Sequence, residues 1–241
     1  MQLISAAQTD IGLARSENED RHLCADELRL YAVADGIGGL PGGAEAAQLA
    51  ITSVLKDARS ARDAGRGPDL AHAFKFANSE VIALARRFAP ETGLGTTLTA
   101  AHIDDAGVMF VASVGDSRCY LFRDGRLKML TIDDTVEQEV AVRRARGENV
   151  QLEERYRNAL TRCIGQPMPL EVKISQYPLQ PGDRVLICSD GVTRMINDSV
   201  IAKRLGQKAE PAVVLGTLVA DALAQGGSDN ITGVVIEARA D

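Results

Sequence analysis

The sequence predicts an α+β fold in which helices cover the outer faces of packed antiparallel sheets. Much of the chain consists of short apolar segments separated by turn-forming residues, such as DDAG at 104–107 and QPGD at 180–183. Several connections are too short for a crossover helix, so neighbouring strands are expected to pair antiparallel. The few helical segments would then lie outside the sheets, which gives a layered sandwich.

Eight segments have the composition of β-strands. They are rich in β-branched and apolar residues and are bounded by turn-forming residues. The predicted strands cover residues 3–8, 28–34, 96–103, 108–114, 117–122, 172–177, 184–188 and 231–238.

Helical patterns occupy most of the other apolar segments. Apolar residues recur at steps of three and four over 68–88, and small and apolar residues dominate 43–62. Further helical patterns follow Asn197 and cover 211–225. Because no repeat or low-complexity linker divides the chain, residues 1–241 are expected to form a single domain.

Residues 131–165 differ from the rest of the chain. The segment mixes arginines and acidic residues with few large apolar residues. We expect a semi-independent flap over the surface. An ordinary solvated helical insertion would have the same composition and stays open as an alternative.

The composition excludes several classes of protein. The 241 residues are 45% hydrophobic, which suffices for a core, but no apolar run approaches the roughly 18 residues of a membrane-spanning helix. The net charge is −6 and the basic residues are dispersed, so nucleic acid is not an expected partner. The N-terminal sequence MQLISAAQTD lacks the features of a targeting peptide, and the four cysteines form no CxxC pair. We therefore expect a cytoplasmic protein with reduced thiols.

Four aspartates occur where an apolar run begins or ends. Asp35, Asp116 and Asp190 each follow such a run, and Asp229 precedes one. A carboxylate at a strand terminus is held by the sheet and projects beyond it, and a neighbouring glycine lets a ligand approach the backbone. Each aspartate alone is best explained as a turn cap. Their wide separation excludes a local calcium loop, so a shared site would have to be assembled by the fold.

The early segment RSENED adds Arg15, Glu19 and Asp20 to this set. Carboxylates that converge repel one another, so their pKa values rise or they bind cations. Oxygen ligands without nearby His or Cys favour Mg²⁺ or Mn²⁺ over zinc. Two such ions can activate a bridging water and hold the oxygens of a displacement at phosphorus. The set therefore predicts a metal-dependent hydrolase.

These residues occur in a series of motifs that resembles the metal-dependent protein phosphatases, the type 2C serine/threonine class, in their compact bacterial form. The resemblance runs from about residue 9 to residue 238. It implies a four-layer α-β-β-α sandwich with two central antiparallel sheets and a metal cluster at one end. The motifs are RSENED at 15–20, VADGIGGLPGG at 33–43, GLGTTL at 93–98, VGDSRCYLFRDG at 114–125, RNALTRCIG at 157–165, PGDRVLICSDG at 181–191 and GGSDNITGVVI at 226–236.

The resemblance implies metal-binding roles for these acids, with Mn²⁺ or Mg²⁺ as the cofactor. Asp35 would bridge two core ions. The Gly36 carbonyl would bind one of them, and Asp190 and Asp229 would bind the other. Asp116 would hold a third, more weakly bound ion together with Asp190.

The RSENED motif supplies the remaining roles that the resemblance implies. Glu19 and Asp20 would bind or orient waters on the metals, and Arg15 would engage the substrate phosphate. A carboxylate cluster repels a phosphate dianion, so a guanidinium with paired donors is useful beside it. A solvated surface arginine is the alternative for Arg15.

Three features depart from the family's pattern. Ile37 stands where some members have a histidine proposed as general acid, so a metal-bound water or another group would protonate the leaving oxygen. Many bacterial members have glutamine at the position of Glu19. The flap begins with Asp133, Asp134 and Thr135 instead of an Asp-His-Ser sequence, so its contacts to substrate are expected to differ.

Histidines and hydroxyl residues are weaker candidates. His22 is close to the acidic motif, whereas the other two histidines fall in a predicted helix and a predicted strand. Ser117, Thr96 and Thr97 lack a His/Asp arrangement that would activate a nucleophile. Packing or strand hydrogen bonds are the expected roles of these hydroxyls.

The leading hypothesis is a cytoplasmic phosphatase that hydrolyses phosphoserine and phosphothreonine on proteins by direct attack of a metal-activated water, without a phosphoenzyme. Arg15, Asp35 and Asp190 are the expected catalytic residues. The substrates would be phosphoproteins made by a cognate Ser/Thr kinase. A non-catalytic phosphoprotein-binding module and a phosphatase of small metabolites are the alternatives. No acid of the series is missing, which favours an enzyme over the binding module.

Overall fold

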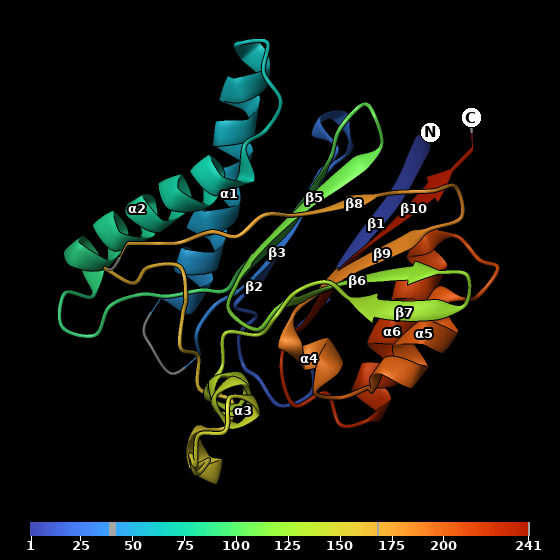
Figure 1. The fold of residues 1–241 in the computed structure, drawn as a ribbon. Helices are drawn as coiled ribbons and strands as arrows, with labels where there is room; N and C mark the ends of the chain where they lie inside the picture. The colour runs from blue at the N-terminus through green and yellow to red at the C-terminus, as the bar shows by residue number, and fades with distance from the viewer. Residues whose placement is uncertain (39–41, 168, 241) are drawn as a thin grey trace.

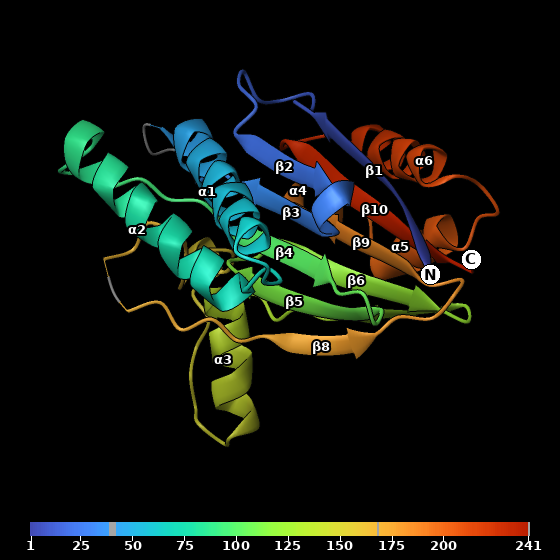
Figure 2. The same cartoon turned by 90° about the horizontal axis from the view of Figure 1, so that it is seen from above.

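Two five-stranded antiparallel sheets pack against each other in the centre of the molecule, and helices cover their outer faces (Figure 1, Figure 2). The computed structural model describes residues 1–38, 42–167 and 169–240. Residues 39–41, which belong to the 33–43 motif, lie outside the described residues. The predicted α+β sandwich with helices outside two antiparallel sheets is confirmed.

The two sheets combine strands from distant parts of the chain. The first sheet has the order β1-β10-β9-β6-β7, and the second has the order β2-β3-β4-β5-β8. The strands are β1 (Gln2–Asp10), β2 (Asp20–Ala25), β3 (Leu30–Asp35), β4 (Leu98–Ile103), β5 (Val108–Val114), β6 (Arg118–Arg123), β7 (Arg126–Met129), β8 (Ser175–Pro178), β9 (Arg184–Cys188) and β10 (Ile231–Arg239).

Four helices form the outer layers. The pair α1 and α2 covers the second sheet, and α5 and α6 cover the first (Figure 2). None of the helices in the described part of the chain is both long and apolar enough to cross a membrane. The helices are α1 (Gly43–Asp63), α2 (Leu70–Phe88), α3 (Val136–Ala145), α4 (Asp190–Thr193), α5 (Asp198–Leu205) and α6 (Pro211–Ala224), with 3₁₀ turns η1 (Asp26–Leu28) and η2 (Glu154–Tyr156).

Alternation along the strands produces separate apolar layers. Successive side chains of a strand point to opposite faces, so one strand can serve two cores. In β3, Tyr31 and Val33 pack in the layer between the sheets, whereas Leu30, Ala32 and Ala34 pack beneath α1 and α2. Central strands of this kind are apolar on both faces, which is why the sequence identifies them as uninterrupted apolar runs.

Two strands were not predicted from the sequence. β2 begins at the charged pair Asp20 and Arg21 of the acidic motif, and this charge obscures its alternation. β7 is a four-residue edge strand with mostly exposed side chains, so it has little hydrophobic pattern. Its formation depends on hydrogen bonds to β6, from which a tight turn with Asp124 at φ 50° separates it.

Arg184 joins the first sheet to the connection between α5 and α6. This buried guanidinium donates to Glu237 Oε2 at 2.7 Å and to the carbonyl oxygens of Leu205, Gln207 and Ala209 at 2.9, 2.5 and 2.6 Å. Glu237 also accepts a hydrogen bond from Arg239 at 2.6 Å. The buried charge is therefore fully paired, and the segment after α5 is fixed to β9.

Replacement of Arg184 by methionine is expected to lower the free energy of unfolding by about 3 kcal/mol, because three buried carbonyls and Glu237 lose a charged donor. Equilibrium urea unfolding measures this change. The matched control is Arg155→Met, which removes a surface pair with Glu153 at 2.9 Å and should cost less than about 1 kcal/mol. Equal stability of the two variants would contradict a structural role for Arg184.

Candidate metal centre

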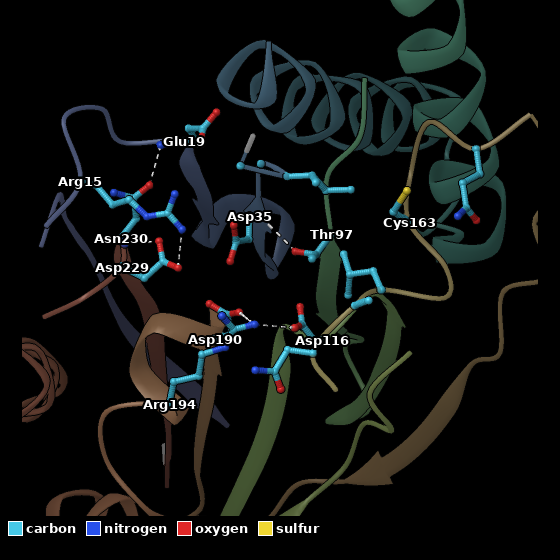
Figure 3. A pocket seen from close by; sticks show the side chains of 17 residues that line it. Arg15, Glu19, Asp35, Thr97, Asp116, Cys163, Asp190, Arg194, Asp229 and Asn230 are labelled. Atoms are coloured by element: carbon cyan, nitrogen blue, oxygen red, sulfur yellow. Dashed lines mark hydrogen bonds and ion pairs between the residues drawn. The ribbon is translucent and has the colours of Figure 1, made fainter. Parts of the chain in front are cut away.

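Six acidic side chains come together at one end of the sandwich; Figure 3 shows those that line the cavity there. Five of them line a cavity of about 690 Å³, together with two arginines. The sixth, Asp20, is buried beside it, since the register of β2 and β3 places Asp20 directly opposite Asp35. The six acids are Glu19, Asp20, Asp35, Asp116, Asp190 and Asp229.

The antiparallel topology explains why residues so far apart in sequence meet here. Asp35 ends β3, and Asp116 lies in the turn between β5 and β6. Asp190 begins α4 just after β9, and Asp229 lies two residues before β10. Antiparallel pairing places the C-terminal end of one strand beside the N-terminal start of its neighbour, so all these positions fall at the same end of the sheets.

Buried hydroxyl groups fix the backbone of Asp35. Its N–H donates to Thr97 Oγ1 at 3.0 Å, and its carbonyl oxygen accepts from Thr96 Oγ1 at 2.8 Å. The Thr97 hydroxyl is also hydrogen-bonded to that of Ser117 at 2.7 Å. These three hydroxyls therefore support the strand ends, as the sequence predicts.

Asn230 ties the loop that carries Arg15 and Glu19 to the start of β10. Its amide nitrogen donates to the carbonyl oxygens of Ile11 and Glu17, both at 2.9 Å, and its Oδ1 accepts from the N–H of Glu19 at 2.8 Å. The sequence alone does not predict a role for Asn230. The only signal was its position directly after Asp229 in the last motif.

Two motif glycines allow the backbone to pack closely around the acids. A Cβ atom at Gly191 would lie 1.9 Å from the carbonyl oxygen of Asn230, and one at Gly36 would lie 2.4 Å from that of Gly43. Any side chain at either position would overlap these backbone atoms. The two glycines therefore hold Asp190 and Asp35 against neighbouring segments of the chain.

Burial and mutual repulsion disfavour ionisation of the acids. Burial raises the pKa of Asp35 well above its ordinary value, and the charges of Asp20 and Asp190 raise it further. Burial also raises the pKa of Asp20 to about 6. Burial and the charge of Asp190 raise the pKa of Asp116 to about 7. Positive charge is needed to keep such a cluster ionised at neutral pH.

The residues present fit hard divalent cations. Asp20 Oδ1 and Asp190 Oδ1 are buried without a hydrogen-bond partner, although buried carboxylate oxygens are normally paired. The surrounding donors are oxygens, the ligands that Mg²⁺ and Mn²⁺ prefer. Within the described residues, no three acidic, histidine or cysteine side chains already converge closely enough to enclose a metal ion.

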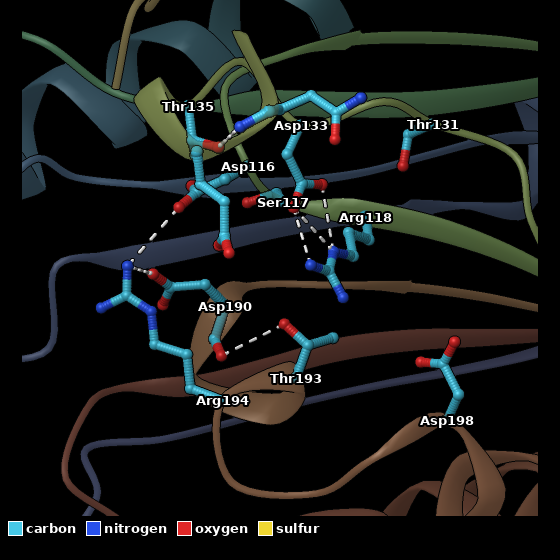
Figure 4. Close-up of polar contacts among 12 residues, drawn as sticks. Asp116, Ser117, Arg118, Thr131, Asp133, Thr135, Asp190, Thr193, Arg194 and Asp198 are labelled. Carbon is cyan, nitrogen blue, oxygen red and sulfur yellow. Dashed lines mark hydrogen bonds and ion pairs between the residues drawn. The ribbon is translucent and has the colours of Figure 1, made fainter. Parts of the chain in front are cut away.

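Two arginines contact different acids of the cavity (Figure 3). Arg15 Nη2 donates to Asp229 Oδ2 at 2.8 Å. Arg194 Nη2 lies 2.5 Å from Asp190 Oδ2 and 3.5 Å from Asp116 Oδ2 (Figure 4). The sequence predicts a role for Arg15 but not for Arg194, whose only signal is its helical spacing of four residues after Asp190.

Part of the 131–165 segment forms one wall of the cavity, to which Asn158, Leu160 and Cys163 contribute. The segment is fastened to the turn between β5 and β6. Arg118, the first residue of β6, donates to Asp133 at 2.7 Å (Figure 4). In the turn itself, Gly115 N–H donates to Asp134 Oδ2 at 3.0 Å. Both acids at the start of the segment therefore point back to the body of the protein.

Histidine is absent from the cavity lining within the described part of the chain. His22 is half-buried in β2, and burial lowers its pKa. His72 contacts Asp57 at 2.7 Å on the outer helices, and His102 lies in β4. Ile37, by contrast, lines the cavity, so an apolar side chain occupies the place where some members of the resembled family have a histidine.

Comparison with known proteins identifies relatives over nearly the whole chain. The family described as Protein phosphatase 2C matches residues 14–222. Serine/threonine protein phosphatase PstP of Mycobacterium tuberculosis is 35% identical over 96% of this chain, which spans only 44% of that relative. Serine/threonine phosphatase stp of Listeria monocytogenes is 30% identical over 95% of this chain and 94% of its own length. The catalytic domain of PstP in complex with two manganese ions superposes with a TM-score of 0.83 at 34% identity, covering 99% of each chain.

Addition of Mn²⁺ is expected to raise the thermal unfolding midpoint by about 5 °C or more at saturation, because the ion binds the assembled carboxylates and not the unfolded chain. Asp35→Asn should abolish this shift while leaving the metal-free protein at least as stable, since it removes a repelling charge. Differential scanning fluorimetry measures both effects. The control Asp105→Asn, at a fully exposed residue outside the site, should keep the shift. An Mn²⁺-independent midpoint in the unaltered protein would refute the metal centre.

Proposed function

Because the chain belongs to the protein phosphatase 2C family, we propose that it is a metal-dependent phosphatase of phosphoserine and phosphothreonine in proteins. The observation that carries this proposal is the convergence of six acids and Arg15 at one end of the sandwich. The Mn²⁺-bound structure of the PstP catalytic domain supports manganese as cofactor, and Mg²⁺ suits the same oxygen donors.

We assign the metal-binding roles by motif and position. Asp35 lies centrally among the acids and would bridge two ions, with the Gly36 carbonyl on one of them. Asp190 and Asp229 would hold the other ion. When bound, the metals activate water as nucleophile for direct attack at phosphorus and neutralise charge on the phosphoryl oxygens.

The protein's own groups position the substrate. Arg15 is partly exposed, and its guanidinium faces the cavity, where its paired donors suit two oxygens of a phosphate dianion. Burial raises the pKa of Glu19, which lies beside Gly43 at the mouth of the acidic cluster. With Asp20, Glu19 would orient water molecules in the site. Ile37 supplies no proton, so the leaving oxygen would take its proton from water.

Protein substrates would approach along the wall formed by residues 158–166. We propose that residues 131–165 act as a flap within a single domain, because the segment leaves the sandwich at the end where the acids lie (Figure 1). Its fastening through Asp133 and Asp134 fixes the base of the flap. Contacts with the peptide around the phosphorylated residue would then come from the segment between α3 and β8.

The proposed activity also implies a source of substrates and a location in the cell. The substrates would be phosphoproteins made by a Ser/Thr kinase. The four cysteines are free thiols, which supports the proposed cytoplasmic location, where thiols stay reduced.

The purified protein should hydrolyse a phosphothreonine peptide only with Mn²⁺ or Mg²⁺ present, and Asp190→Asn should lower kcat at least about 10³-fold, because it removes a ligand and its charge. Phosphate release in the presence and absence of chelator measures this. Asp105→Asn should keep full activity. Faster turnover of sugar phosphates than of phosphopeptides would favour a metabolite phosphatase, and turnover in excess chelator would contradict the proposal.

Arg15→Ala is expected to raise KM for the phosphopeptide about tenfold or more and to weaken inhibition by inorganic phosphate in parallel, because a charged donor to the dianion is lost. Arg15→Lys keeps the charge without the paired donors, so its KM should lie between those of the unaltered protein and Arg15→Ala. Steady-state kinetics on both variants provides the test. If neither KM nor phosphate inhibition changes, Arg15 does not bind the phosphate.

A further inference from the structure

Arg194 connects two acids that come from different parts of the fold. It follows α4 directly, one helical turn after Asp190, and its backbone N–H donates to the Asp190 carbonyl at 2.8 Å. Its guanidinium contacts Asp190 Oδ2 at 2.5 Å and Asp116 Oδ2 at 3.5 Å (Figure 4). The side chain is 39% exposed, whereas both carboxylates are nearly buried. One tethered cation therefore bridges the two acids from the solvent side.

These two acids are the pair to which the family resemblance assigns a third, weaker metal ion. A guanidinium and a divalent cation cannot use the same carboxylate oxygens. At a separation of about 5 Å they would also repel each other strongly, even at the effective dielectric constant of a protein surface. Arg194 thus occupies the place where a third ion would bind.

The two oxygens of Asp190 differ in their surroundings. Oδ2 is paired with Arg194, whereas Oδ1 is buried and has no partner. Asp190 can therefore give Oδ1 to a core metal ion while Oδ2 stays with the arginine. The ion pair between Arg194 and Asp190 is therefore compatible with two core metal ions and excludes only the third, weaker ion.

The charges in the site balance with two divalent ions. The six acids carry six negative charges when ionised, and Arg15 and Arg194 carry two positive charges. Two divalent ions neutralise the remainder. A third would leave excess positive charge in a partly buried site, which is unfavourable without further anions.

We propose that Arg194 is a built-in cation that replaces the third metal ion, so that this chain binds two divalent ions where the family pattern provides for three. The inference rests on the proposed metal-dependent function. It makes Arg194 a residue that determines metal stoichiometry.

The test counts bound Mn²⁺. Unaltered protein is titrated with MnCl₂, and free Mn²⁺ is measured by its electron paramagnetic resonance signal, with isothermal titration calorimetry in parallel. We expect two ions per chain. Arg194→Met keeps the aliphatic stem without the charge and should bind a third ion at least about tenfold more tightly than the unaltered protein does.

Two further variants show whether the number of bound ions depends on the charge at position 194 or on a general disturbance of the site. Arg194→Lys keeps a cation at the position and should bind two ions. Arg194→Met combined with Asp116→Asn should lose the gained ion and return to two. Thermal unfolding without metal checks that each variant is folded, and Arg194→Gln serves as a second neutral variant if the methionine variant is unstable.

The outcomes distinguish the two proposals. Three ions in the unaltered protein, or two ions in both neutral variants, would overturn the role of Arg194 and leave the proposed function intact. No bound Mn²⁺ in the unaltered protein would overturn the proposed function together with the inference.

Discussion

Repulsion among buried carboxylates is the constraint around which this end of the molecule is built. Burial raises the pKa of Asp35, and the neighbouring charges of Asp20 and Asp190 raise it further. A hydrogen bond from the Thr96 hydroxyl and one to the Thr97 hydroxyl hold the backbone of Asp35 in place. The apolar layers on both faces of β3 supply the stability that offsets the repulsion. The site is therefore a strained arrangement of charge that a divalent cation would relax.

Fold prediction from the sequence succeeds where burial leaves a pattern. The central strands are apolar on both faces, so β3, β5 and β9 appear as clear runs, and short connections imply antiparallel pairing. β7 is an exposed edge, and it leaves no such pattern. Its position depends on a neighbour that is defined only after the chain has folded.

The site residues likewise divide into those that the sequence pattern predicts and those that it does not. Asp35, Asp116, Asp190 and Asp229 are found because each lies at the boundary of an apolar run, and the motif series orders them. Arg194 and Asn230 act through partners elsewhere in the fold. Arg194 contacts Asp116 across a gap of 78 positions, and Asn230 holds a loop more than 200 positions away. Long-range contacts of this kind have no periodicity, so a single sequence does not reveal them.

The Asn230 amide connects two residues of the proposed site. One side chain holds the loop at Ile11, Glu17 and Glu19, and Arg15 lies between these anchor points. Arg15, which we propose binds the phosphate, and Glu19, which we propose orients water, thus lie on a loop that one side chain fixes. A change in the length of this loop would therefore displace both residues together.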